Sequence, residues 1–187
     1  MTHPHLKTIL ARIDALLSRQ DRVIVAIEGS CGSGKTTLAA LLAEQRDCNV
    51  FHMDDFFLRP HQRTPERFTQ PGGNVDYERF REEVLLPLAS GKFFSYRPFD
   101  CKSMTLSDPV EVTPKNLTII EGSYCMHPYF GSPYDLTIFL TVEDELRRRR
   151  ILQRPAHLHR RFFEEWIPME ARYFTAFSIA ESCHLVF

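Results

Sequence analysis

Short apolar runs alternate with helical segments along this chain. Runs rich in β-branched and aromatic residues, each long enough for one buried strand, occur at 23–27, 49–53, 117–120, 136–142 and 184–187. Segments with helical character lie between them, at 5–19, 37–46, 77–88, 143–153 and 162–180. Pro168 is expected to kink or divide the last of these. Strands that alternate with helices predict an α/β fold, with a parallel sheet covered on both faces.

Two proline- and glycine-rich stretches interrupt this alternation. Residues 59–74 and 96–114 lack periodic apolar positions and are predicted to be long loops. Long loops within a compact domain tend to be functional. We therefore consider 56–76 and 96–114 as candidate substrate-binding regions.

The length, charge balance and cysteine content of the chain exclude several kinds of partner and site. With 187 residues and 43% hydrophobic content, the chain suits a single domain, 1–187. Lys plus Arg number 23 against 24 Asp plus Glu, so no overall charge favours nucleic acid or a membrane surface as a partner. Five widely spaced cysteines without a C-x-x-C pair argue against a disulfide framework and a structural zinc site. A cytoplasmic location is expected, because no run has the length of a membrane span.

One segment fills every fixed position of the phosphate-binding pattern G-x-x-x-x-G-K-[ST], known as Walker A. It follows the first predicted strand and precedes a predicted helix, so backbone N–H groups and the helix dipole would face an anion. In this pattern Lys35 reaches the β- and γ-phosphates, and Thr36 is a ligand of the accompanying magnesium ion. The expected phosphate-binding residues are Gly29, Ser30, Cys31, Gly32, Ser33, Gly34, Lys35, Thr36 and Thr37.

Acidic residues directly follow two of the other predicted strands. Asp54 and Asp55 follow the second strand, and Glu121 follows the third. Ligands of open parallel sheets bind beyond the carboxyl ends of the strands, where these side chains would meet. Asp54 is our candidate for the general base on a phosphoryl acceptor, with Asp55 as the alternative. Glu121, and also Asp54, are candidate magnesium ligands; a helix cap or an ion pair would be the purely structural roles.

An ordered set of further segments resembles the uridine kinase and phosphoribulokinase family. These segments are Asp54-Asp55-Phe56-Phe57, Gly73-Asn74-Val75-Asp76-Tyr77, Tyr96-Arg97-Pro98-Phe99-Asp100, Glu121-Gly122-Ser123-Tyr124 and the arginine run after Ile138-Phe139-Leu140. The resemblance spans nearly the whole chain. It implies a three-layer P-loop NTPase fold, with five parallel strands in the order 2-3-1-4-5 and a helical lid near 147–165. It also implies ATP, Mg²⁺ and transfer of the γ-phosphate to a hydroxyl of a small metabolite.

The resemblance assigns roles around the acceptor. Asp54 matches the family's base, and Phe57 stands where uridine kinases usually carry a tyrosine. Asp76 matches an aspartate that binds ribose hydroxyls, while Tyr96 and Phe99 fall in the segment that lines the acceptor pocket. Uridine kinases carry a histidine and an arginine soon after that segment, where this chain reads Cys101-Lys102-Ser103-Met104-Thr105.

This departure leaves the acceptor open. A nucleoside is the expected substrate, and a pantothenate-like or nicotinamide-riboside-like compound is the alternative. An ATP-binding regulatory protein without kinase activity is a third interpretation. The chain ends on an apolar run at 184–187, which also leaves a homo-oligomer open.

A basic cluster at 147–150, with Arg154, lies on the predicted charged helix. Residues three and four apart share a helix face, so only some of these side chains can face the phosphates. By resemblance to the family's lid, Arg150 and Arg154 are favoured as catalytic residues, with Arg149 next. The other arginines are expected on a solvated face, paired with acidic residues at 143–145.

Cys31 stands inside the phosphate motif. Neighbouring amides and Lys35 are expected to lower the pKa of its thiol and make it reactive when nucleotide is absent.

Overall fold

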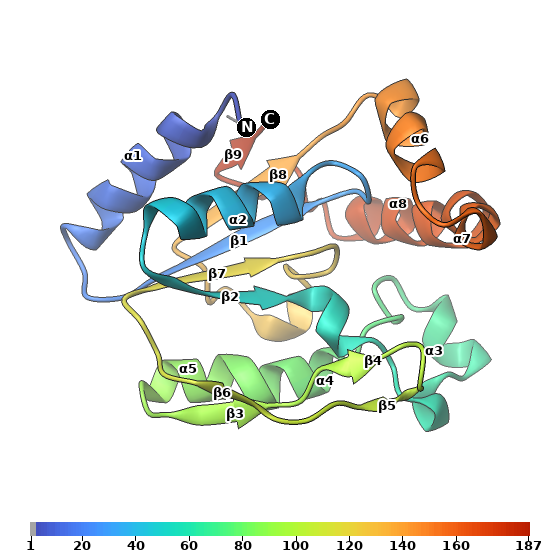
Figure 1. The fold of residues 1–187 in the computed structure, drawn as a ribbon, viewed down its shortest axis with the longest axis horizontal. Coiled ribbons are helices and arrows are strands. Elements are labelled where there is room, and N and C mark those ends of the chain that lie inside the picture. The colour runs from blue at the N-terminus through green and yellow to red at the C-terminus, as the bar shows by residue number, and fades with distance from the viewer. Residues whose placement is uncertain (1–2) are drawn as a thin grey trace.

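A five-stranded parallel sheet lies at the centre of the computed structural model, which describes residues 3–187 (Figure 1). Its strands are β1 (Val23–Gly29), β2 (Cys48–His52), β7 (Leu117–Glu121), β8 (Leu136–Leu140) and β9 (Leu185–Val186). They lie in the order β2-β7-β1-β8-β9, and every pairing is parallel. Counted along the chain this order is 2-3-1-4-5, so the predicted topology is confirmed.

Two helices cover one face of the sheet, α1 (Leu6–Leu17) and α2 (Lys35–Gln45). Ile9 and Ile13 of α1, four residues apart, point the same way and are fully buried. Leu38 and Leu42 of α2 follow the same spacing and join the same apolar cluster. Both helices thus dock through one apolar stripe, and α2 begins where the phosphate motif ends.

The opposite face packs against a continuous helical segment composed of α4 (Tyr77–Phe80), a π-helical turn at Arg81–Leu85 and α5 (Leu86–Ser90). Pro87 has no N–H group to donate to the preceding turn, which accounts for the wide π turn just before it. Phe80 and Val84 pack in one apolar cluster with Phe51, Phe56 and Tyr173. This aromatic layer supports the chain that leaves β2.

The two predicted loops contain short elements that the sequence did not indicate. Residues 59–74 include a 3₁₀ turn at Pro60–Gln62 and the helix α3 (Pro65–Thr69), capped by Thr64. Residues 94–112 hold four short strands: β3 (Phe94–Tyr96), β4 (Phe99–Asp100), β5 (Thr105–Leu106) and β6 (Val110–Val112). They pair as two antiparallel ribbons, β3 with β6 and β4 with β5. Strands of two or three residues are too short to show an alternating pattern.

The remaining helices project beyond the carboxyl ends of the strands (Figure 1). They are α6 (Asp144–Leu152), α7 (Ala156–Arg161), a π turn at Phe162–Trp166 and α8 (Ile167–Ala176). The π turn ends two residues before Pro168, where the expected break in the helix occurs. Two further 3₁₀ turns lie at Met53–Phe56 and Pro128–Phe130. Within residues 3–187, no helix is both long enough and apolar enough to cross a bilayer.

Candidate functional site

The phosphate loop joins the end of β1 to the start of α2. Gly29 has φ +140°, and a Cβ there would lie 2.3 Å from the carbonyl oxygen of Leu140, so only glycine fits. Gly34 precedes α2 in the left-handed region, with φ +106°. These glycines let the loop turn sharply between a central strand and a helix N-terminus.

Several N–H groups of this loop are free to bind an anion. In the described chain, the N–H groups of Gly32, Gly34, Lys35 and Thr36 donate to no protein acceptor. The Lys35 side chain is buried, and its Nζ donates to the carbonyl oxygens of Gly29 (2.9 Å) and Ser30 (3.0 Å). Amides, a helix N-terminus and a lysine thus converge as they do in phosphate-binding loops.

Two of the three predicted magnesium ligands, Thr36 and Glu121, lie in direct contact. Thr36 Oγ1 donates to Glu121 Oε1 over 3.0 Å. His52 Nδ1 donates to the same carboxylate oxygen over 2.6 Å, and this hydrogen bond is the main cause of the raised pKa of His52. His52 and Glu121 are directly paired in the register of β2 and β7, so the sheet itself brings them together. Hydroxyl and carboxylate oxygens beside a phosphate loop fit Mg²⁺.

Asp54 lies at the start of the 3₁₀ turn that follows β2. Its side chain is open to solvent, yet protein surrounds it on most sides, and the loss of hydration raises the pKa of its carboxyl group. The negative charges of Glu121, Glu170 and Asp55 act in the same direction, and the positive charge of Lys35 opposes them. Asp54 is therefore within electrostatic range of the phosphate-loop lysine.

Asp55 is contacted by residues of β3 and α4. Tyr96 Oη donates to Asp55 Oδ2 over 3.5 Å, and Arg79 Nη2 donates to the Asp55 backbone oxygen over 3.1 Å. Burial raises the pKa of Asp55, and the charge of His52 opposes that rise. The two adjacent carboxylates thus have different surroundings, with Lys35 the main opposing charge at Asp54 and His52 at Asp55.

Asp76 is buried and acts as the N-cap of α4, accepting a hydrogen bond from the Arg79 backbone N–H over 3.2 Å. Its Oδ2 has no hydrogen-bond partner in the described chain, although the Nε atoms of Arg59 and Arg79 lie 3.4 and 3.6 Å away. Asp76 therefore caps α4 through one oxygen, which is the structural role considered for acidic residues. Its other oxygen lies between two guanidinium groups.

The three aromatic residues predicted near the acceptor lie close to the turn after β2. Phe57 forms an isolated antiparallel bridge with Val75 and packs its half-buried ring against the core. Tyr96 is buried against Phe51 and Phe56, and Phe99 is buried in β4. Tyr96 and Phe99 are thus largely covered by protein, and Tyr96 directs its hydroxyl to Asp55.

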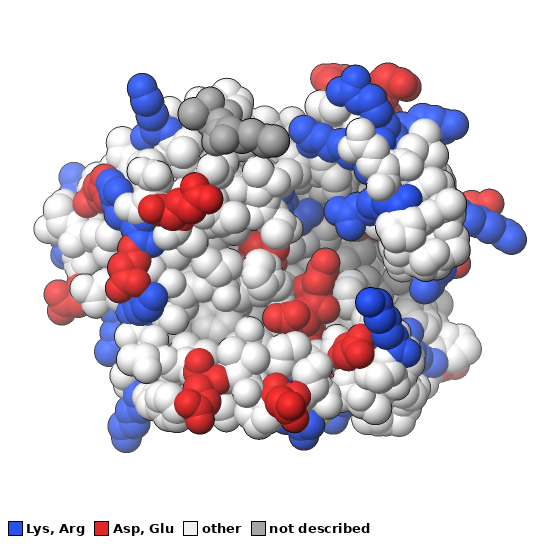
Figure 2. Space-filling model, in the orientation of Figure 1, with Lys and Arg blue, Asp and Glu red and all other residues white. Residues whose placement is uncertain are grey.

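Two members of the arginine cluster, Arg147 and Arg150, meet the phosphate loop. Arg150 Nη1 donates to the Gly32 carbonyl oxygen over 2.6 Å, and Arg147 also lies against Gly32. Arg154, by contrast, stacks over the ring of Phe162, 5.4 Å from its centroid. Figure 2 shows basic side chains gathered over α6 and α7, across a hollow from acidic ones. Of the two favoured arginines, the structure places Arg150 at the loop and Arg154 away from it.

Glu170 is a site residue that the sequence analysis missed. It lies on α8, its side chain is only 5% exposed, and its Oε2 accepts the Cys31 backbone N–H over 2.9 Å. Its Oε1 accepts the Ser123 hydroxyl over 2.6 Å. No spacing within 162–180 marks this residue, because only the tertiary fold brings α8 to the phosphate loop.

Glu28 is a second residue that the sequence analysis missed. It is fully buried in β1 and accepts the backbone N–H groups of Tyr124 (2.8 Å) and Met126 (2.9 Å). Burial raises its pKa to about 7, against the opposing effects of these hydrogen bonds and of Lys35. A carboxylate inside an otherwise apolar strand was the available signal in the sequence. Glu28 holds in place the turn that carries Glu121.

The expected reactivity of Cys31 is wrong. Burial raises the pKa of its thiol to about 12, and the negative charge of Glu170 contributes in the same direction. Lys35 lowers this pKa, as expected, but its effect is smaller. Burial and the Glu170 carboxylate on α8 thus outweigh the effect of Lys35 on the pKa of this thiol.

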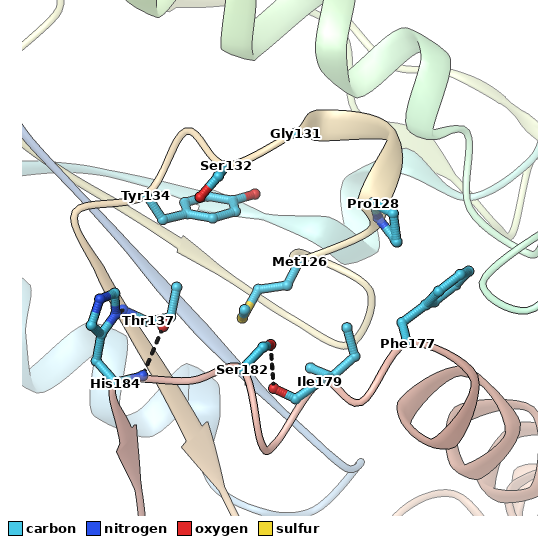
Figure 3. A pocket seen from close by; sticks show the side chains of 10 residues that line it. All are labelled: Met126, Pro128, Gly131, Ser132, Tyr134, Thr137, Phe177, Ile179, Ser182 and His184. Carbon is cyan, nitrogen blue, oxygen red and sulfur yellow. Dashed lines mark hydrogen bonds between the residues drawn. The ribbon is translucent and has the colours of Figure 1, made fainter.

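A cavity of about 250 Å³ lies apart from these residues (Figure 3). Apolar side chains such as Met126 and Ile179 line it, together with a few polar groups. Several of these polar groups are bonded within the protein: the His184 N–H donates to Thr137 Oγ1 and the Ser182 hydroxyl donates to the Ile179 carbonyl oxygen. The cavity therefore offers no chemistry comparable to that of the phosphate loop.

Two curated relatives match this chain in sequence. A uridine kinase from Ligilactobacillus salivarius is 30% identical over 143 residues, which cover 71% of this chain and 66% of that protein. A protein assigned provisionally to the uridine kinases in Schizosaccharomyces pombe is 30% identical over 164 residues, covering 74% of this chain and 68% of its own length. The chain thus spans about two thirds of the length of these relatives. No protein-family model matches it.

Solved structures share the fold at lower identity. A possible uridine kinase from Bacillus stearothermophilus superposes with a TM-score of 0.71 at 21% identity, covering 96% of this chain and 99% of that one. A kinase assigned provisionally to a fructose transport system in Silicibacter gives a TM-score of 0.69 at 23% identity, covering 97% and 96%. These similarities show that the fold is that of P-loop kinases.

Proposed function

Because this chain belongs to the uridine kinase-like family of P-loop kinases, we propose that it transfers the γ-phosphate of ATP to a hydroxyl group of a small metabolite, with a nucleoside as the leading candidate. The observation that carries this proposal is the convergence of the phosphate loop, its buried Lys35 and the acidic turn after β2 that holds Asp54. It supports a terminal phosphate held beside a carboxylate that can accept a proton.

The proposed reaction is an in-line displacement at the γ-phosphorus. The acceptor oxygen forms a bond to phosphorus, the bond from phosphorus to the bridging β-oxygen breaks, and ADP leaves with that electron pair. The hydroxyl proton passes to Asp54, whose raised pKa makes it a better base than an ordinary aspartate. Lys35 and Arg150 are placed to stabilise negative charge on the transferring group.

Magnesium fits the oxygen atoms at the end of β7. Thr36 and Glu121 would hold it, and Asp54 is a further oxygen donor nearby. When bound, the ion supplies positive charge to the β- and γ-phosphates. His52 orients Glu121 through its short hydrogen bond.

The acceptor would enter between the turn after β2 and the ribbon β4–β5. For an acceptor hydroxyl, Asp76 offers a buried oxygen that accepts no hydrogen bond and lies between the guanidinium groups of Arg59 and Arg79. Tyr96 and Phe99, in β3 and β4, are the aromatic residues proposed for the acceptor pocket. Cys101 is exposed at the β4–β5 turn, where the charges of Arg63 and Asp54 influence its pKa. Because this turn replaces residues typical of uridine kinases, a vitamin-like alcohol remains the alternative acceptor.

A product assay tests the activity directly. The protein is incubated with ATP, Mg²⁺ and a panel of nucleosides, pantothenate-like alcohols and nicotinamide riboside, and the products are analysed by mass spectrometry. We expect one acceptor class to gain a single phosphoryl group. ATP turnover that never depends on any acceptor would instead favour a regulatory ATP-binding protein.

Asp54→Asn tests the proposed base. We expect phosphoryl transfer to fall roughly 10²–10⁴-fold while ATP affinity is retained, because the substitution removes the proton acceptor and leaves the phosphate loop intact. Asp55→Asn is the matched control, since it alters the adjacent carboxylate. If Asp54→Asn kept normal turnover and Asp55→Asn lost it, the base would be Asp55.

A further inference from the structure

We propose that the Glu170 carboxylate and the γ-phosphate of ATP compete for the same hydrogen-bond donors, so that binding of a triphosphate displaces Glu170 and moves α8. This inference deepens the proposed function and rests on it. It assigns to Glu170 the role of a positioning residue that reports the presence of the terminal phosphate to the lid helices.

The contacts of Glu170 are those of an anion bound in the phosphate loop. Both of its carboxylate oxygens lie within hydrogen-bond distance of the Cys31 N–H, at 2.9 and 3.2 Å. Ser123 Oγ donates to it over 2.6 Å, and the same hydroxyl lies 3.4 Å from Lys35 Nζ. A buried carboxylate thus occupies one corner of the anion site that the motif forms.

A triphosphate cannot share this corner without strong repulsion. Like charges a few ångström apart, in a partly desolvated site, raise each other's energy by amounts that exceed an ordinary hydrogen bond. The charge of Glu170 already reaches Asp54 and Cys31, which border the region where the terminal phosphate would lie. Departure of Glu170 relieves this repulsion and frees the Cys31 N–H.

The donors next to Glu170, the Ser123 hydroxyl and Lys35 Nζ, both have protein acceptors other than Glu170. The Ser123 hydroxyl carries one hydrogen, and the Gly29 carbonyl oxygen lies 3.0 Å away as its alternative acceptor. Lys35 Nζ contacts two loop carbonyl oxygens in the present arrangement and can turn towards phosphate. The site therefore has two complete hydrogen-bond arrangements, one with Glu170 bound and one with phosphate bound.

The segment before Glu170 is suited to movement. A π turn at Phe162–Trp166 interrupts the regular hydrogen bonding, and Pro168 at the second position of α8 removes another N–H donor. Helix α7 lies directly before this turn, and α6, which carries Arg150, contacts α7. A shift of α8 would therefore be transmitted to the lid helices.

The chain contains its own fluorescent probe for this movement. Trp166 is the sole tryptophan, one helical turn before Glu170. Its indole packs edge-on against Phe162, with ring centroids 4.5 Å apart, and Arg161 lies 4.8 Å from the ring centroid. A displacement of α8 alters these contacts and hence the emission of Trp166.

Glu170→Gln keeps the size of the side chain and removes its charge. Wild type and variant are titrated with ATP and with ADP, in the presence of Mg²⁺, by calorimetry and by Trp166 fluorescence. We expect the variant to bind ATP about tenfold more tightly and ADP within about twofold of wild type, because only ATP carries the competing phosphate. In wild type, ATP should change Trp166 emission more than ADP does. Glu164→Gln, an exposed position paired with Arg160, is the charge-matched control and should leave both affinities unchanged.

The opposite results would overturn the inference. Weaker ATP binding by Glu170→Gln, or equal changes for ATP and ADP, would mean that Glu170 only shapes the loop. If the variant failed to fold, Ser123→Ala would serve instead, since it removes the 2.6 Å bond without altering α8 and should also favour ATP over ADP. Absence of ATP binding by the wild type would contradict the proposed function itself, which is a separate outcome.

Discussion

At the scale of single residues, three carboxylate side chains have different roles because their surroundings differ. The Asp54 side chain is exposed to solvent on one side, but the surrounding protein reduces its hydration. This raises its pKa and suits a proton acceptor. Glu28 is fully buried and surrounded by N–H donors, which suits a structural anchor. Glu170 is buried against loop donors that an incoming phosphate also needs. The surrounding residues therefore determine what each of these three carboxylates can do, and the residue type alone does not.

Cys31 provides a test at this scale. Burial and the charge of Glu170 raise the pKa of its thiol to about 12, so little thiolate exists near neutral pH. We expect iodoacetamide to modify the exposed Cys101 well before Cys31, as followed by peptide mass spectrometry. Glu170→Gln should speed modification of Cys31, because it removes one cause of the raised pKa. Rapid labelling of Cys31 in the wild type would contradict this account.

At the scale of elements, the carboxyl ends of β1, β2 and β7 and the start of α2 form the fixed part of the site. Their positions follow from parallel strand pairing, which aligns His52 with Glu121 and puts both beside Thr36. Helices α6, α7 and α8 lie beyond the carboxyl ends of the strands and form the second part of the site (Figure 1). Side chains that connect the two parts include Arg150, Glu170 and Tyr173.

Arg150 tests the contribution of α6. Its guanidinium reaches the phosphate loop, so Arg150→Ala should lower the turnover number by about 10²-fold through lost stabilisation of the transferring group. Arg148→Ala, an exposed neighbour on the same helix that lies over the ring of Phe163, is the control and should change turnover by no more than about twofold. Steady-state kinetics on both variants make the comparison. Equal losses would indicate that the net charge of the helix matters, and not the contact of Arg150.

At the scale of the whole molecule, Glu28 links elements that are distant in sequence. It lies in the central strand and accepts hydrogen bonds from the turn after β7 and from the Tyr173 hydroxyl of α8. Tyr173 is itself fully buried among aromatic rings. The sheet, the turn after β7 and helix α8 therefore share one buried carboxylate.

This link predicts a pH dependence of the free energy of unfolding. Burial raises the pKa of Glu28 from 4.5 to about 7 in the folded protein. Between these values the unfolded chain releases the proton while the folded protein keeps it, so this group's contribution to stability falls as pH rises. Relative to Glu28→Gln, the wild type should lose about 2 kcal/mol between about pH 5 and pH 8. Urea denaturation of both proteins measures this, and parallel pH profiles would refute it.

Much of the fold could be predicted because its signals are local. Apolar runs marked all five strands of the central sheet, and the resemblance supplied their order. The helices α1 and α2 follow from side chains spaced three and four residues apart, such as Ile9 and Ile13. The short strands between Phe94 and Val112 were missed, because ribbons of two or three residues are stabilised by pairing and leave no periodic pattern.

The sequence by itself determined the phosphate loop, its lysine and the acidic residues at the strand ends, because each depends on residues adjacent in the chain or on one strand's direction. Only the tertiary structure decided that Glu170 lies in the loop, that Arg150 and not Arg154 reaches it, and that the pKa of Cys31 is raised. These features depend on how α6 and α8 pack across the sheet's edge. Contacts between segments more than a hundred residues apart are set by the packed core as a whole, so no local pattern encodes them.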